Sequence, residues 1–162
     1  MAPNSRLERS GYAGRSAWAL AGSAMYEFVG LFSTSGMPFR SAASAMWPSA
    51  AVVPLSRPFE GSGLRFSDQR IAALGEDSPP DPKLLDRIIE ISRQCSSDPI
   101  VYVEAECWGG DCGYSGRVFR DGRLVCAEGG PGALSRLLSH LGAQLDDREY
   151  FEPFERNFPW TG

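Results

Sequence analysis

The segment Ile100–Cys107 constrains the fold most, because its side chains alternate in character along the chain. One set is small and apolar and would face a core: Val101, Val103, Ala105 and Cys107. The other set carries polar groups and would face solvent: Tyr102, Glu104 and Glu106. A period of two is typical of a half-buried strand in an antiparallel sheet. We therefore predict a central strand here, with one face in the core and the other in solvent.

Further strand signals occur on both sides of this segment. We predict strands at residues 26–32, 51–55, 64–66, 114–119 and 123–126. Pro54 has no N–H to donate to a ladder, so the strand at 51–55 should lie at an edge of the sheet. Asp121-Gly122 separates the last two strands and favours a two-residue hairpin turn, since both residues tolerate positive φ. Residues 33–49 are rich in Ser, Ala, Met and Pro, and we expect a loop there.

Two amphipathic helices are predicted in the second half of the chain. The first begins at Asp81, a favourable N-cap, with Pro82 at the first helical position, and its apolar stripe continues to Cys95. The second spans residues 131–141 with four leucines on one side. An apolar stripe has to be buried against another element. We therefore predict an α+β fold with a mainly antiparallel sheet of about five to six strands and two helices packed on one face.

The domain is predicted to span residues 25–162. Residues 1–24 lack hydrophobic periodicity, and we expect either a disordered leader or a mis-assigned start, with translation beginning at Met25. The tail at residues 146–160 is acidic and rich in aromatic side chains. Aromatic groups in such number would not be left in water, so the tail should dock on the domain.

The charge balance limits the choice of partner. Sixteen basic residues face 20 acidic ones, which gives a net charge of −4. The sequence has no cluster of Lys and Arg that would bind a phosphate backbone, so we do not expect nucleic acid as a ligand. It also lacks an apolar run of about 18 residues, and we expect no membrane span. We predict a cytoplasmic protein whose acidic surface suits a basic protein partner.

Four cysteines occur in the chain: Cys95, Cys107, Cys112 and Cys126. We expect reduced, metal-free thiols, because structural zinc sites usually draw their ligands from two closely spaced pairs. Only Cys107 and Cys112 are close in sequence, across a glycine-rich loop. A disulfide between these two residues and a zinc site are the alternatives. We predict no cofactor.

The loop from Trp108 to Tyr114 is the most unusual segment, with three glycines between two strands. Such glycines permit a tight turn or the close approach of a ligand to the backbone. Exposed aromatic side chains are enriched in protein interfaces. We therefore predict a binding surface on this loop and on the polar face of the preceding strand: Tyr102, Glu104, Glu106, Trp108, Gly109, Gly110, Asp111 and Tyr114. A purely structural turn and a solvated strand face are the alternatives.

Catalytic signatures give little support to an enzyme. The sequence has no phosphate-binding loop, no Gly-x-Ser-x-Gly elbow and no His-Glu-x-x-His helix. Its one histidine, His140, lies at the end of the second predicted helix, where the helix dipole favours a cation. A small enzyme or metal-dependent hydrolase using Glu104, Glu106 and Asp111 is the alternative function, because neighbouring carboxylates can hold a cation or share acid and base roles.

The pattern Tyr102-x-Glu104-x-x-Cys107-Trp108-Gly109-Gly110-x-x-Gly113, followed by an Asp121-Gly122 turn, resembles a group of small uncharacterised bacterial proteins. Their core reads Tyr-x-Glu-x-x-Tyr-Phe-Gly-Gly-x-Gly, and the similarity covers about residues 99–160. This chain differs in having Cys-Trp for Tyr-Phe and one extra residue in the loop. In size and architecture the chain also resembles the immunity proteins that neutralise bacterial toxins.

The absence of catalytic motifs in the sequence, the acidity and the aromatic loop together predict a non-catalytic protein-binding module. The resemblance to immunity proteins implies an immunity-type inhibitor of a bacterial toxin as its specific role. A structural accessory subunit within a larger assembly is a further alternative.

Overall fold

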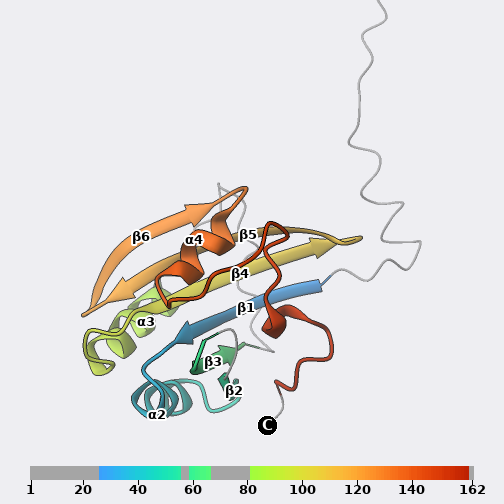
Figure 1. Cartoon of the computed structure of the whole chain (residues 1–162). Helices are drawn as coiled ribbons and strands as arrows, with labels where there is room; N and C mark the ends of the chain where they lie inside the picture. The colour runs from blue at the N-terminus through green and yellow to red at the C-terminus, as the bar shows by residue number, and fades with distance from the viewer. Residues whose placement is uncertain (1–25, 56–58, 67–80, 161–162) are drawn as a thin grey trace, which may run out of the picture.

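A six-stranded antiparallel sheet organises the computed structural model, which describes residues 26–55, 59–66 and 81–160 (Figure 1). The strands follow one another in space as β2-β3-β1-β4-β5-β6. Their bounds are β1 (Tyr26–Ser33), β2 (Ala51–Leu55), β3 (Gly61–Arg65), β4 (Ile100–Trp108), β5 (Asp111–Arg120) and β6 (Arg123–Gly129). The predicted α+β class is confirmed, and Pro54 lies on an edge strand as expected. The predictions for residues 1–24 and Met25 lie outside the residues that the structure describes.

Within the described residues, three α-helices and one short 3-10 helix accompany the sheet: α2 (Met37–Met46), α3 (Pro82–Gln94), α4 (Ala133–Ser139) and η1 (Glu152–Phe154). Helix α3 begins as predicted, because the backbone N–H of Lys83 donates to Asp81 Oδ1 at 3.0 Å and satisfies part of the first turn. Helix α4 is shorter than the predicted span of 131–141 and begins after Gly132. None of the helices in the described ranges is long and apolar enough to cross a membrane.

Helix α2 corrects the loop predicted at residues 33–49. Its buried residues are Phe39, Ala42 and Ala43, which recur at the spacing of a single helix face. Pro38 lies in its first turn, where a missing N–H costs no hydrogen bond. The stripe is only one turn long and built mostly from alanine, so its periodicity is weak in the sequence although the helix is well packed.

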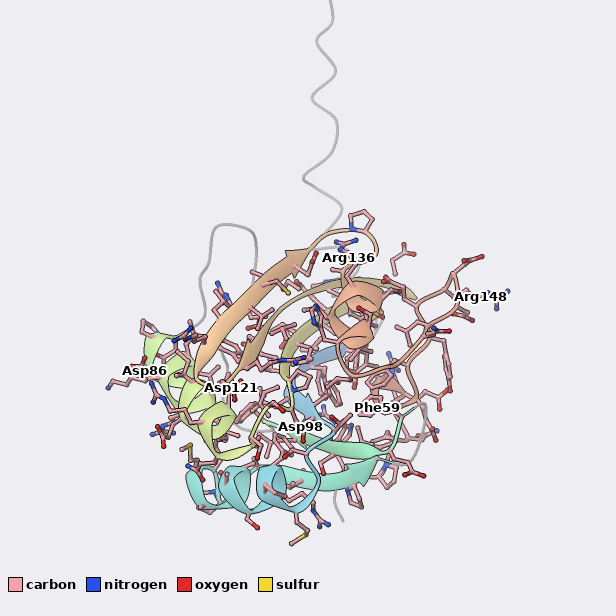
Figure 2. All side chains as sticks on the ribbon, turned by 60° about the vertical axis from the view of Figure 1, so that its left-hand side comes forward. Phe59, Asp86, Asp98, Asp121, Arg136 and Arg148 are labelled. Carbon is pink, nitrogen blue, oxygen red and sulfur yellow. A yellow bond between two sulfur atoms is a disulfide. The ribbon has the colours of Figure 1, made fainter. Side chains whose placement is uncertain are left out.

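The helices cover both faces of the sheet, so the two predicted helices, which correspond to α3 and α4, lie on opposite faces and not on one face as predicted. Helix α4 packs on the face that carries Val101 and Val103. Helices α2 and α3 pack on the opposite face, around Tyr102. Figure 2 shows Asp86 on α3 and Arg136 on α4 at opposite sides of the sheet. The second face gains its apolar character from strands other than β4, through Leu31, Leu64 and Phe119.

The C-terminal segment docks on the α4 side of the sheet, as the density of aromatic residues predicts. Phe151 and Trp160 are buried there. The ring of Trp160 lies 5.3 Å from that of Phe28, and the ring of Phe151 lies 5.1 Å from that of Phe32, measured between centroids. The indole Nε1 of Trp160 donates to the backbone oxygen of Pro153 at 3.0 Å, so its polar atom is satisfied inside the core.

If both faces are packed cores, removing buried methyl groups from either side should destabilise the protein. We expect Ile88→Ala on α3 and Leu137→Ala on α4 each to lower the free energy of unfolding by about 2–5 kcal/mol, because both side chains are fully buried. Leu124→Ala is the matched control, since this leucine is 53% exposed on β6 and its truncation should cost less than about 0.5 kcal/mol. Urea unfolding measures all three, and a neutral result for either buried position would contradict the two-sided core.

Candidate functional site

Strands β4 and β5 form a hairpin that closes in a two-residue turn. The ladder continues to the pair Trp108 and Asp111, and only Gly109 and Gly110 lie between them. Both glycines have positive φ, +56° and +98°. A Cβ at either position would meet nothing within 4 Å, so the backbone conformation, and not crowding, demands glycine. The loop predicted from Trp108 to Tyr114 is therefore mostly strand.

The end of this hairpin projects from the sheet (Figure 1). In the part of the chain that the structure describes, β1 accompanies β4 only to the pair Tyr26 and Cys107. Strand β6 accompanies β5 only to the pair Gly129 and Ser115. Residues 108–113 thus extend past the described parts of both neighbouring strands, and Cys107 forms the last pair with β1. We call residues 107–113 the hairpin tip.

A disulfide joins Cys107 and Cys112 across the hairpin tip. The prediction of free thiols is wrong for this pair and confirmed for Cys95 and Cys126. The reason is the turn: with only two residues in the loop, Cys107 and Cys112 become direct cross-strand neighbours, and their side chains lie on the same face of the sheet. As members of a longer irregular loop the two cysteines need not stand opposite each other, so the sequence supports their disulfide only as an alternative.

Trp108 is the large apolar side chain of the hairpin tip, and 41% of it is exposed. Its indole Nε1 donates to Glu106 Oε1 at 2.9 Å, which fixes the ring along the strand. Asp111 lies directly opposite Trp108 and is also exposed. The predicted exposed positions of Trp108, Gly109, Gly110 and Asp111 are confirmed, and Glu106 is partly exposed.

A second carboxylate stands beside Glu106. Glu27 of β1 is its direct cross-strand partner, so both side chains project from the same face of the sheet. Like charges placed directly opposite each other destabilise a sheet. Sequence reasoning missed Glu27, because its closeness to Glu106 depends on the register of two strands that are far apart in the chain. The only local signal is a charged residue inside an otherwise apolar strand.

Tyr102 and Glu104 do not belong to the exposed surface, and the prediction that they face solvent is wrong. Tyr102 is 0% exposed and Glu104 is 6% exposed. Tyr102 lies in the core beneath α2 and α3, and its hydroxyl donates to Glu104. Burial, followed by the charge of Glu104 and this hydrogen bond, raises the pKa of Tyr102 far above its ordinary value. The tyrosine therefore keeps its proton and acts as a buried donor.

Tyr114 lies on the other side of the sheet from Trp108. It is the cross-strand partner of Ala105, which belongs to the core under α4. Its ring stacks on Phe154 of the C-terminal segment, with centroids 5.8 Å apart. Tyr114 is half-buried and anchors the base of the hairpin, so it is not part of the surface around Trp108.

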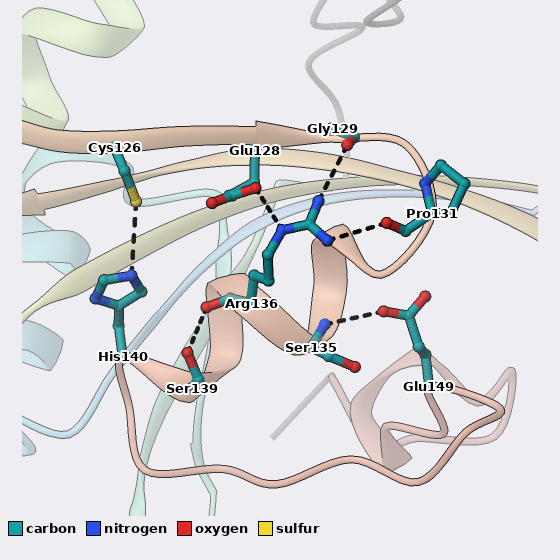
Figure 3. A network of polar contacts seen from close by, with 9 residues as sticks. All are labelled: Cys126, Glu128, Gly129, Pro131, Ser135, Arg136, Ser139, His140 and Glu149. Carbon is teal, nitrogen blue, oxygen red and sulfur yellow. Dashed lines mark hydrogen bonds and ion pairs between the residues drawn. The ribbon is translucent and has the colours of Figure 1, made fainter.

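A separate polar network joins α4 to the end of β6 (Figure 3). His140 Nε2 lies 3.6 Å from Cys126 Sγ, and Arg136 forms an ion pair with Glu128 at 2.6 Å. Arg136 also donates to two backbone carbonyls of the β6–α4 connection. Burial, together with the nearby charge of Glu128, raises the pKa of the Cys126 thiol. A protonated thiol is a poor nucleophile, so this network serves to attach the helix to the sheet.

The carboxylates of the predicted hydrolase alternative do not assemble into a metal site. Across the described ranges, no group of three or more His, Cys, Asp or Glu side chains is arranged to hold a metal ion. Glu104 is buried beside Tyr102, whereas Asp111 is exposed at the turn. Glu104, Glu106 and Asp111 are thus distributed between the core and the hairpin tip.

Comparison with protein-family models, curated proteins and solved structures finds no match for this chain. The resemblance to small bacterial proteins therefore stays a prediction. What the protein does has to be inferred from the geometry of the hairpin and the surface around it.

The buried tyrosine provides a test of this division between core and surface. Tyr102→Phe removes the donor to Glu104 inside the protein and should lower the free energy of unfolding by about 1–3 kcal/mol. Trp108→Ala removes a partly exposed ring and should cost less than about 1 kcal/mol. Chemical denaturation measures the loss in the free energy of unfolding for both variants. A larger loss for Trp108→Ala than for Tyr102→Phe would place the indole in the core.

The same tyrosine predicts a dependence of stability on pH. Above about pH 10 tyrosines in the unfolded chain ionise, whereas Tyr102 in the folded protein stays protonated because its pKa is raised. The contribution of Tyr102 to the free energy of unfolding is thus complete below about pH 10 and is lost as the pH rises further. We expect the stability of Tyr102→Phe to fall less steeply above pH 10 than that of the wild type, as followed by urea unfolding. Parallel slopes would contradict the raised pKa.

Proposed function

We propose that the protein is a non-catalytic protein-binding module that uses the hairpin tip to contact its partner. The observation that carries this proposal is Trp108, a large and partly exposed aromatic ring held on a projecting, disulfide-closed hairpin. The proposed contact surface consists of the following residues: Glu27, Glu106, Trp108, Gly109, Gly110 and Asp111. An immunity-type inhibitor of a bacterial toxin is the specific role that the sequence resemblance suggests.

The hairpin tip has the physical properties of a binding anchor. Tryptophan is enriched among the few interface residues that supply most of the binding energy. The ring of Trp108 is already held by its hydrogen bond to Glu106, and the strands on either side are joined by the disulfide. A preorganised anchor loses little conformational entropy on association, so more of its contact energy contributes to affinity.

The charges around Trp108 favour a basic partner. Glu27 and Glu106 lie opposite each other, and Asp111 is exposed at the turn. A Lys or Arg of the partner placed between these carboxylates would relieve their mutual repulsion and guide the encounter. The net charge of the whole chain is −4, which attracts the same kind of surface from a distance. The partner proposed here is a protein with an apolar recess surrounded by basic side chains.

Replacing the anchor tests the proposal. Purified wild type, Trp108→Ala and Leu124→Ala are immobilised and exposed to a lysate of the source organism. The expected result is a protein retained by the wild type and by Leu124→Ala, an exposed leucine on β6, but not by Trp108→Ala. With that protein purified, the loss in affinity should be at least about 2 kcal/mol, roughly 30-fold in Kd. Equal retention by all three proteins would reject the hairpin tip as the contact surface.

The acidic residues should affect the rate of encounter more than the lifetime of the complex. We expect Glu106→Gln combined with Asp111→Asn to lower the association rate constant and weaken its dependence on salt, because exposed charges steer diffusion and are screened by ions. Surface plasmon resonance at two ionic strengths separates the two rate constants. An association rate that is insensitive to salt in the wild type would contradict a basic partner.

A further inference from the structure

We propose that the Cys107–Cys112 disulfide is a thiol–disulfide exchange site, which dithiols reduce in the folded protein and which controls the shape of the hairpin tip. The first part, the exchange itself, stands on the structure of the hairpin alone. The second part, control of partner binding, rests on the proposed function of the same hairpin.

Access is the first reason. Cys112 is exposed and lies in the part of the hairpin that extends past β1 and β6, whereas Cys107 is half-buried at the last residue pair that β4 forms with β1. An attacking thiolate can therefore reach the bond while the sheet stays intact, and accessibility is one of the factors that set the rate of exchange. Cys95 provides the contrast within the same chain, since it is fully buried at the C-terminal end of α3 in the core on that side of the sheet.

The exchange is a two-electron reduction. A thiolate of the dithiol attacks the sulfur of Cys112, forms a mixed disulfide, and releases Cys107 as a thiolate that takes up a proton. The second thiol of the reductant, as a thiolate, then attacks the mixed disulfide. This step releases Cys112 as a thiolate, which takes up a proton, and leaves the reductant with an internal disulfide. The protein gains two electrons and two protons, and an oxidant such as a glutathione disulfide reverses the process.

The hairpin tip depends on this bond more than an ordinary hairpin would. Three of its residues are Gly109, Gly110 and Gly113, which contribute no side chains to hold the strands together. Gly113 is the cross-strand partner of Glu106, so that pair has a side chain on one strand only. Glycine also loses more conformational freedom on ordering than any other residue. Without the disulfide, the tip is held mainly by its ladder hydrogen bonds and should open locally.

The base of the hairpin limits the change to the tip. Ala105 and Tyr114 form the next inward-facing pair after the disulfide, and both pack in the core under α4. Reduction should therefore release residues 107–113 and leave the rest of the sheet folded. Disulfides in reducing compartments are usually transient, either catalytic or redox-sensing, and the predicted cytoplasmic location would place this bond in that class.

The first measurement tests the exchange site without any partner. Folded protein is treated with dithiothreitol in the absence of denaturant, its thiols are trapped with iodoacetamide, and the labelled positions are identified by mass spectrometry. We expect Cys107 and Cys112 to be labelled while Cys95 stays unlabelled and the circular dichroism spectrum is unchanged. Labelling of Cys107 and Cys112 only under conditions that also label Cys95 would show that reduction requires unfolding, and would overturn the proposal.

The second measurement tests the effect on the hairpin tip. Cleavage by chymotrypsin after Trp108 is compared in the oxidised protein and in Cys107→Ser/Cys112→Ser, which mimics the reduced state without new chemistry. We expect cleavage to be at least about tenfold faster in the variant, because proteolysis follows the population of the locally open form. Cleavage after Tyr150, which is 54% exposed, serves as the internal control and should not change. Equal rates at Trp108 would show that the bond does not control the tip.

These outcomes are separate from those of the proposed function. If Trp108→Ala retains every partner, the binding proposal fails while the labelling of Cys107 and Cys112 can still succeed. If the labelling fails, the exchange site is rejected while the effect of Trp108→Ala on partner binding stands. If both succeed, Cys107→Ser/Cys112→Ser should bind the identified partner at least about tenfold more weakly than the oxidised protein, through the cost of ordering the open tip.

Discussion

Burial of strand β4 on both faces is the constraint on which the rest of the structure depends. From Ile100 to Ala105 the strand is paired with β1 and β5 at its edges, with α4 covering one face and α2 and α3 surrounding Tyr102 on the other. Each fully buried apolar side chain there contributes about 1.5–3 kcal/mol relative to exposure. The polar atoms of Tyr102 and Glu104 are tolerated in this position because they bond to each other.

The exit of β4 from this core positions the candidate surface. After Ala105 the exposure of the strand rises through Glu106 to Trp108, while the backbone continues without interruption. The hairpin tip is therefore a direct extension of the most constrained strand in the protein, with the orientation of Trp108 fixed by that strand and by its bond to Glu106. A surface built on a rigid element in this way is preorganised, which is what a binding anchor requires.

Local signals could be predicted from the sequence, and features that depend on register or on distant contacts could not. The N-cap at Asp81 and the Asp121-Gly122 turn were predictable because neighbouring residues alone determine them. The burial of Tyr102 and Glu104 was not, because Leu31, Leu64 and Phe119 of other strands make that face apolar. The disulfide and the Glu27–Glu106 pair likewise follow from which residues stand opposite each other. Trp108 was predictable as an exposed aromatic residue because it borders a glycine-rich turn.

Native-state hydrogen exchange resolved by residue tests the central claim, that a fully buried strand continues into a locally independent tip. The amides of residues 101–105 should exchange only through global unfolding, with the full free energy of unfolding at low denaturant. In Cys107→Ser/Cys112→Ser, the amides of residues 109–113 should exchange through local opening, with a much smaller free energy of opening. Equal protection of both segments, or local opening of residues 101–105 without the rest of the sheet, would contradict it.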